Sequence, residues 1–162
     1  MHHYQDLIKL FNTCFAKTHN TRLVKGGEEP LYMPANENCA YHSIIFAHGF
    51  FSSALHECAH WFIAGEERRK LIDYGYWYVP DGRSKEQQAL FQVVEVKPQA
   101  LEWLLSKAAK FPFQFSVDNL DGEEWDTESF KTAVKEQVSI YEQEGLPPRA
   151  QIFHAALREF YK

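Results

Sequence analysis

The sequence predicts an α+β fold in which several helices surround a small sheet. The chain has 162 residues, a length that favours one domain, residues 1–162, with a substantial buried core. Its hydrophobic content of 45%, with 15% aromatic residues, is typical of a globular protein. Apolar residues recur every three or four positions over most of the chain, whereas strand-like runs are few and short. This balance of many helices and few strands favours the α+β class.

The first part of the chain is predicted to hold one helix and the strands. Apolar positions spaced by three and four predict an amphipathic helix over residues 4–16. Residues 21–24 and 32–33 flank a Gly-Gly pair, which predicts a hairpin around that turn. Residues 42–47 are apolar and partly β-branched, which indicates a buried strand.

The remaining elements are predicted to be helices. The first spans residues 53–64, with Ser52 or Ser53 as a plausible N-cap and Gly65 as a C-terminal stop. Pro98 is expected to separate two later helices, since proline is favoured at a helix start and disrupts a helix interior. The other predicted helices cover residues 85–95, 99–110, 127–144 and 151–161.

Composition argues against several classes of protein. The net charge of −5 is a weak argument against bulk binding to nucleic acid, which usually needs a basic face. No apolar run is long enough to span a membrane, and no signal peptide is visible. Three scattered cysteines without a C-x-x-C pair exclude a Cys₄ zinc site and favour a reducing compartment. We therefore expect a cytoplasmic monomer without nucleic-acid or membrane partners.

The pentapeptide His56-Glu57-Cys58-Ala59-His60 is the strongest chemical signal in the chain. Residues i and i+4 lie on one face of a helix, so the two imidazoles can bind one metal ion from the same side. Glu57 lies one position round the helix, where a catalytic carboxylate could reach a metal-bound water. Cys58 is turned away from His56 and is predicted to pack in the core.

Two histidines leave such a site incomplete, because catalytic metal sites usually have three protein ligands and an open position. Glu95 is the preferred third ligand, since a carboxylate among valines is costly to bury unless it is paired or bound to a cation. The full set of candidates for this position is His42, His48, Asp73, Asp81, Glu95 and Asp118.

Three classes of function fit these residues. With zinc, Glu57 would act as general base and the site would hydrolyse a peptide or another polar bond. With iron(II), two histidines and one carboxylate would leave positions open for dioxygen. A binding module stabilised by a metal, without turnover, is the third reading. The residues alone do not separate these alternatives.

Longer strings resemble a known family, the bacterial elongation factor P hydroxylases, over most of the chain. The pentapeptide is joined by strings that are much more specific than it is. They include Asn20-Thr21-Arg22-Leu23, Phe46-Ala47-His48-Gly49-Phe50, Tyr74-Gly75-Tyr76-Trp77-Tyr78, Pro80-Asp81-Gly82-Arg83 and Glu95-Val96-Lys97-Pro98-Gln99-Ala100-Leu101.

The resemblance implies a specific fold and reaction. The implied fold is similar to that of the YbeY-type metal-dependent endoribonucleases, and the implied ligands are His56, His60 and Glu95. The implied cofactor is iron(II), with dioxygen as co-substrate. The implied partner is translation elongation factor P, whose β-lysylated lysine side chain would be hydroxylated.

A long cationic substrate suggests further site residues. Four aromatic side chains could line the opening of the site through cation–π contacts, and two acidic ones could pair with the substrate amines. These residues are Tyr74, Tyr76, Trp77, Tyr78, Asp73 and Asp81. An arginine, Arg22 or Arg83, could hold the carboxylate of a co-substrate.

Overall fold

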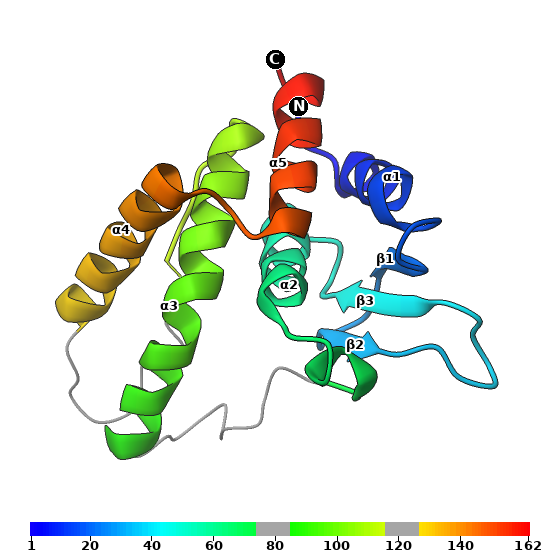
Figure 1. Cartoon of the computed structure of the whole chain (residues 1–162), viewed down its shortest axis with the longest axis horizontal. Helices are drawn as coiled ribbons and strands as arrows, with labels where there is room; N and C mark the ends of the chain where they lie inside the picture. The colour runs from blue at the N-terminus through cyan, green and yellow to red at the C-terminus, as the bar shows by residue number, and fades with distance from the viewer. Residues whose placement is uncertain (74–84, 116–126) are drawn as a thin grey trace.

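The computed structural model describes residues 1–73, 85–115 and 127–162, and within them the chain forms five α-helices, one short 3₁₀-helix and three strands (Figure 1). In chain order these are α1 (Tyr4–Phe15), β1 (Thr21–Lys25), β2 (Leu31–Met33), β3 (His42–Phe46), α2 (Phe51–Ile63), η1 (Arg68–Lys70), α3 (Lys85–Ala108), α4 (Thr127–Glu144) and α5 (Pro148–Phe160). The predicted α+β class is confirmed. The finer expectation of a YbeY-type arrangement stays a prediction.

The sheet has the order β1-β3-β2, so the predicted hairpin of the first two strands is wrong. β3 lies between them, parallel to β1 and antiparallel to β2, and Ile44 is the partner of both Leu23 and Tyr32. The reason is burial: β3 carries the apolar run Ile44-Ile45-Phe46, in which Ile44 and Phe46 are almost inaccessible to solvent, and it takes the central position. Gly26 continues the pairing with β3, since its N–H donates to Phe46 O at 2.8 Å.

Gly26 is tightly packed against β3, which gives a first prediction. A Cβ atom at Gly26 would overlap Ile45 Cγ2 and lie 3.2 Å from Phe46 O, whereas a Cβ at Gly27 would meet no atom within 4 Å. We expect Gly26→Ala to lower the free energy of unfolding by about 1–3 kcal/mol, because overpacking forces the sheet to shift. Urea denaturation measures this, with Gly27→Ala as the control expected to stay close to wild type.

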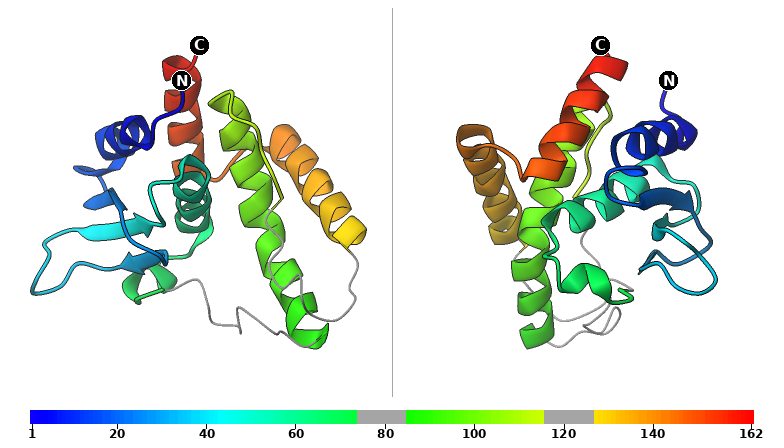
Figure 2. Two further views of the ribbon diagram at one scale, coloured as in Figure 1. Left: turned by 180° about the vertical axis from the view of Figure 1, so that it is seen from behind. Right: turned by 45° about the vertical axis from the view of Figure 1, so that its right-hand side comes forward.

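The core joins the sheet side of the molecule to the helices. Phe11 of α1 is completely buried, and its ring centroid lies 4.8 Å from that of Phe15, 5.4 Å from Trp61 and 5.7 Å from Phe153. Three helices distant in sequence, α1, α2 and α5, therefore share one aromatic cluster. Figures 1 and 2 show α3 lying between α4 on one side and the α2–α5 pair on the other.

Helix α2 begins at Phe51, two residues before the predicted start, and Phe50 at its N-cap makes no side-chain cap. The serine capping prediction is wrong because Ser53 lies inside the first turn, where its hydroxyl accepts a hydrogen bond from Ala47 N at 3.0 Å. This bond fixes the connection from β3 to α2. At the other end, Arg69 Nη2 donates to Trp61 O at 2.7 Å and satisfies a carbonyl that the helix leaves free. The pentapeptide thus lies on a helix held at both ends.

Pro98 lies inside α3, so the prediction of two separate helices is wrong. Proline has no N–H group, so it cannot donate the helical hydrogen bond to the carbonyl of Val94, four residues earlier. Val94 lines a cavity. Burial of Ala100, Leu101 and Leu105 on the following turns favours the continuous helix despite this loss. As a result Glu95 is followed, two turns later, by Glu102 on the same helix face.

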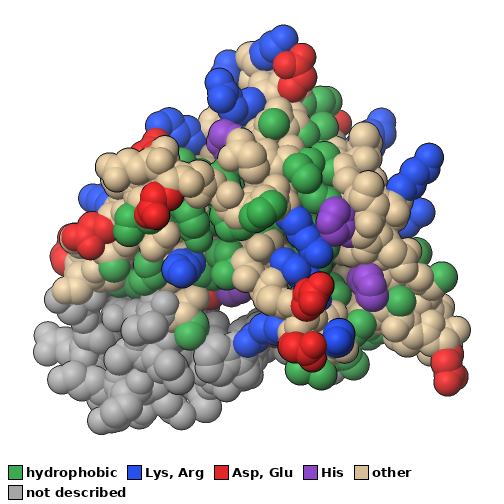
Figure 3. All heavy atoms as spheres, in the orientation of Figure 1, with side chains coloured by type: hydrophobic (Ala, Val, Ile, Leu, Met, Phe, Trp, Pro, Cys, Tyr) green, Lys and Arg blue, Asp and Glu red, His purple; other side chains and the backbone are tan. Residues whose placement is uncertain are grey.

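The other predicted elements agree with the structure. Residues 4–16, 42–47 and 127–144 were expected as helix, strand and helix, and α1, β3 and α4 confirm them. The last helix begins at Pro148, three residues earlier than predicted. Among the described helices, none combines the length and hydrophobicity needed to cross a membrane. The face drawn in Figure 3 carries acidic and basic side chains intermixed rather than one continuous basic stripe.

Candidate metal centre

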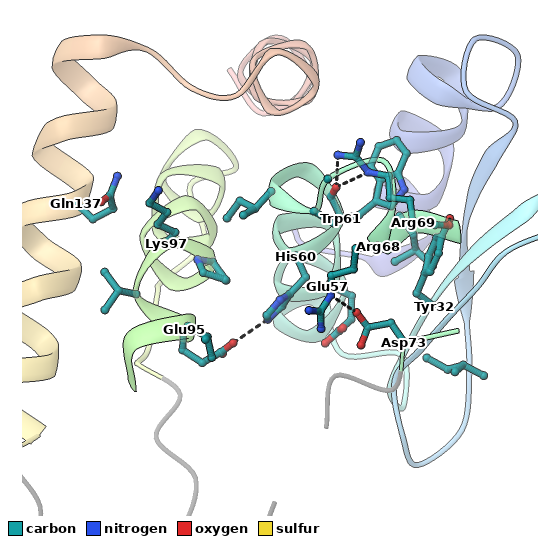
Figure 4. A pocket seen from close by; sticks show the side chains of 18 residues that line it. Tyr32, Glu57, His60, Trp61, Arg68, Arg69, Asp73, Glu95, Lys97 and Gln137 are labelled. Atoms are coloured by element: carbon teal, nitrogen blue, oxygen red, sulfur yellow. Dashed lines mark hydrogen bonds and ion pairs between the residues drawn. The ribbon is translucent and has the colours of Figure 1, made fainter. Parts of the chain in front are cut away.

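Helices α2 and α3 bring two histidines and one carboxylate together. His56 and His60 project from one face of α2, and Glu95 approaches them from α3 (Figure 4, where His60 and Glu95 are labelled). One ligand atom from each residue lies within 4.8 Å of the others, the only such group found among the described residues. The structure therefore assembles the three side chains that the sequence selected, although a metal-binding role for them stays a prediction.

The distances within this group suit ligands of one ion. His56 Nε2 lies 3.1 Å from His60 Nε2 and 3.3 Å from Glu95 Oε1, while His60 Nε2 lies 3.0 Å from Glu95 Oε2. Nitrogen and oxygen ligands about 2.0–2.2 Å from a common ion, at right angles to one another, are about 3 Å apart. The three side chains fit a mononuclear metal site without rearrangement of the backbone.

Glu95 is the most deeply buried member, with only 4% of its side chain exposed. Among the described residues its Oε2 atom has no hydrogen-bond donor, although it lies 3.0 Å from His60 Nε2. Burial raises the pKa of this carboxyl, but the charges of His60 and His56 outweigh it and hold the pKa well below its ordinary value. A cation would satisfy this anionic, underbonded oxygen beside the imidazole of His60.

Glu102 is a member of this site that sequence reasoning missed. Its Oε1 atom lies 2.6 Å from His56 Nδ1, and only 5% of the residue is exposed. Burial lowers the pKa of His56, but Glu95 and Glu102 raise it more, so this pKa lies well above the ordinary value. The available signal was an acidic residue seven positions after Glu95, which returns to the same helix face after two turns.

These pKa shifts predict how pH affects the metal-free protein. The raised pKa of His56 contributes stability that is complete below its ordinary value of 6.5 and is lost as pH rises through the raised value. The depressed pKa of Glu95 contributes stability that is complete above its ordinary value of 4.5 and is lost as pH falls towards the depressed one. Thermal denaturation in chelator should therefore show a maximum that includes the interval from 4.5 to 6.5.

The alkaline side of that maximum provides the check. In His56→Ala the decline of the melting temperature above this interval should be weaker, because the group that titrates there is gone. An identical alkaline decline in wild type and His56→Ala would contradict the assignment.

Glu57 points into the cavity beside the histidines (Figure 4). Burial raises the pKa of this carboxyl, and the neighbouring His56 and His60 lower it by less. In the described part of the chain Glu57 makes no hydrogen bond and no ion pair. A carboxylate without a protein partner is therefore available to a molecule that occupies the cavity.

The cavity has a volume of about 500 Å³ and combines an apolar wall with charged groups. Ile63, Val94 and Val96 belong to the apolar wall, and His60 and Glu95 lie at the metal-site end. Asp73 lines it as well, but it is engaged by Arg68, whose Nε donates to Asp73 Oδ2 at 2.9 Å. The complete lining is Leu31, Tyr32, Ile44, Glu57, His60, Trp61, Ile63, Ala64, Gly65, Arg68, Arg69, Asp73, Val94, Glu95, Val96, Lys97, Pro98 and Gln137.

The other predicted site residues fall into two groups. Tyr74, Tyr76, Trp77, Tyr78, Asp81, Arg83 and Asp118 lie outside the described residues, so the predictions made for them stay predictions. His42 accepts a hydrogen bond from Ala35 N, His48 is exposed and Arg22 lies over the ring of Tyr41, so none of them joins the cluster. Cys58 is completely buried, which confirms its predicted role in the core.

Fold and site together define an α+β protein with a candidate mononuclear centre of two histidines and one carboxylate. Residues 10–162 match the family model described as elongation factor P hydroxylase, and the chain belongs to that family. It is also 59% identical, over 160 residues, to a protein of Haemophilus influenzae named elongation factor P lysine hydroxylase. This similarity covers 99% of the present chain and 90% of the relative.

Proposed function

We propose that this protein hydroxylates the β-lysylated lysine side chain of translation elongation factor P in the cytoplasm, using iron(II) and dioxygen. His56, His60 and Glu95 would hold the iron. Family membership and the name of the Haemophilus influenzae relative support the reaction and the substrate. The observation that carries the metal assignment is the buried Glu95 carboxylate: its underbonded Oε2 lies beside His60 Nε2, and its Oε1 lies beside His56 Nε2.

The ligand set favours iron over zinc for this reaction. Two histidines and one carboxylate with open positions are typical of non-haem iron(II) oxygenases, and zinc has no accessible redox change. Bound iron(II) would supply the redox chemistry that activates dioxygen for hydroxylation of an unactivated C–H bond. The protein would hold the ligands rigidly on two packed helices and present the substrate carbon to the remaining positions.

The cavity suits a long side chain with a cationic end. Its apolar wall would pack against methylene groups, which favours burial of the aliphatic part of a lysine. Glu57, which has no hydrogen-bond or ion-pair partner among the residues that the structure describes, would bind an ammonium group. Asp73 already pairs with Arg68, so it would contribute less than the sequence suggested. The proposal that Tyr74, Tyr76, Trp77 and Tyr78 line the opening rests on their position in the sequence directly after Asp73.

Intact-mass analysis of β-lysylated elongation factor P tests this function. The substrate is incubated with the protein, iron(II), a reductant and air, and parallel samples lack dioxygen or contain zinc in place of iron. A gain of one oxygen atom that disappears in both controls is the expected result. No change in mass, together with tightly held zinc in the purified protein, would instead favour a zinc hydrolase in which Glu57 is the general base.

Replacing Glu57 by glutamine separates substrate binding from metal binding. We expect Glu57→Gln to keep its full metal content while kcat/KM for hydroxylation falls roughly 10- to 100-fold, the effect of losing a hydrogen bond to a charged group. Metal analysis and steady-state assays of the same preparation measure both quantities. Loss of iron from this variant would show that Glu57 is itself a ligand and would contradict the assignment.

A further inference from the structure

We propose that Glu102 is a positioning residue that fixes the tautomer and the ring orientation of His56, so that its Nε2 atom is presented to the metal. This inference rests on the proposed function in one respect, the role of His56 Nε2 as a ligand atom. The hydrogen bond itself exists in the protein whether or not a metal is bound. Glu102 touches neither the metal position nor the cavity, and it would act only through His56.

The direction of the hydrogen bond follows from its partners. A carboxylate has only acceptor oxygens, so at 2.6 Å from Glu102 Oε1 the His56 Nδ1 atom must carry the proton. In the neutral imidazole the other nitrogen, Nε2, then has a free lone pair. That atom is the one facing His60 Nε2 at 3.1 Å and Glu95 Oε1 at 3.3 Å. The Glu102 bond therefore selects the nitrogen that the site needs for a metal.

The residues around Glu102 restrict its side chain to the position from which it accepts the hydrogen bond of His56. The residue is 5% exposed on α3, next to completely buried Leu101 and Leu105. A carboxylate in such a position is costly unless it is hydrogen-bonded or paired, and His56 is its side-chain partner among the described residues. Because α3 carries both Glu95 and Glu102, one rigid helix sets the positions of a candidate ligand and of the group that orients another.

The two histidines of the pentapeptide differ in this respect. In the described chain, the Nδ1 atom of His60 has no hydrogen-bond partner comparable to Glu102, and 37% of its side chain is exposed. The His56 side chain is only 20% exposed, and its Nδ1 atom is hydrogen-bonded to Glu102. Hydrogen bonds of this kind to ligating histidines typically change metal affinity 10- to 100-fold when they are removed. Removal of the Glu102 side chain should therefore weaken metal binding by its effect on His56, and not by an effect on His60.

Metal titration of the full chain is the first test. Cobalt(II) or zinc(II) is titrated in competition with a chromophoric chelator into wild type, Glu102→Ala and Glu102→Gln. We expect the alanine variant to bind about 10- to 100-fold more weakly. The glutamine variant should stay within a few-fold of wild type, because its amide oxygen can still accept the His56 Nδ1 proton. Ser106→Ala is the control, since Ser106 is a buried polar residue one turn further along α3 and should leave the affinity unchanged.

Long-range proton–nitrogen spectra of the histidine rings are the second test, made on metal-free protein at a pH where the imidazoles are neutral. His56 should occur as the Nδ1–H tautomer in wild type and Glu102→Gln and as a mixture in Glu102→Ala. This readout does not depend on metal binding or on hydroxylation. Should wild type and His56→Ala bind metal equally weakly, the metal site would be refuted while the tautomer of His56 would still test Glu102.

Two results would overturn the inference. One is a folded Glu102→Ala protein with wild-type metal affinity and an unchanged His56 tautomer. The other is a Glu102→Gln protein that folds but loses as much affinity as the alanine variant would, because charge rather than the oriented hydrogen bond would then be responsible. Circular dichroism of each variant establishes that it is folded, and the glutamine variant serves if the alanine variant does not fold.

Discussion

Replacement of Glu95 by alanine is expected to abolish both metal binding and hydroxylation. This residue is the proposed ligand that comes from α3, and without it the two histidines of α2 would hold an ion from one side only. The loss should exceed the 10- to 100-fold that outer-shell partners typically contribute. Metal content after dialysis and the mass of β-lysylated elongation factor P after incubation measure the two effects.

The control for this experiment is a carboxylate on another helix. Glu136 is exposed on α4, and Glu136→Ala should keep both metal content and activity. Glu95→Gln should resemble Glu95→Ala, because a neutral amide of the same shape is a much poorer ligand for a hard cation. A Glu95→Ala protein that retains iron and turnover would show that the third ligand lies elsewhere.

Phe153 is expected to give a large loss of stability on truncation. It is completely buried on α5, and its ring centroid lies 5.7 Å from both Phe11 and Phe62, so it links α5 to α1 and α2. Phe153→Ala should reduce the free energy of unfolding by about 3–5 kcal/mol, because it removes apolar contacts and leaves a cavity. The melting temperature should fall by roughly 2–4 °C for each kcal/mol in a protein of this size.

The neighbouring Ile152 provides a matched control for that change. Ile152 lies on the same helix but is 49% exposed. Ile152→Ala should change the stability by less than about 1 kcal/mol, because little apolar surface returns to water. Denaturant titration of both variants under the same conditions measures the difference. Equal losses of stability in the two variants would show that the burial of a side chain on α5 does not determine how much it stabilises the protein.

Elements with a strong local pattern were predictable from the sequence. The spacing of apolar residues in α1 and α4 and the apolar run of β3 gave nearly the observed limits. The same local reasoning was wrong about the strands on either side of Gly26 and about Pro98, where a hairpin and a helix break were expected. Burial of β3, which includes Phe46, favoured its central position over the hairpin, and burial of Leu101 favoured a continuous α3 over a break at Pro98.

In the candidate site, too, the features that depend on local sequence were predictable and those that depend on distant contacts were less so. The two histidines share a helix, so their separation depends only on helix geometry and was accessible from the pentapeptide. Glu95 was accessible through its unusual apolar context, which implied a partner. Glu102 was not singled out, because its partner lies 46 positions away and its seven-residue spacing from Glu95 is informative only if the helix continues through Pro98.

The sequence by itself determined the family, the helix that carries His56 and His60, and the apolar segments that form the core, because each depends on residues close together in the chain. Only the tertiary structure decided the strand order, the continuity of α3 and the pairing of Glu102 with His56. These features depend on which buried surfaces meet when α3 packs against α2. That choice is made by the total burial of distant segments, which local spacing does not contain.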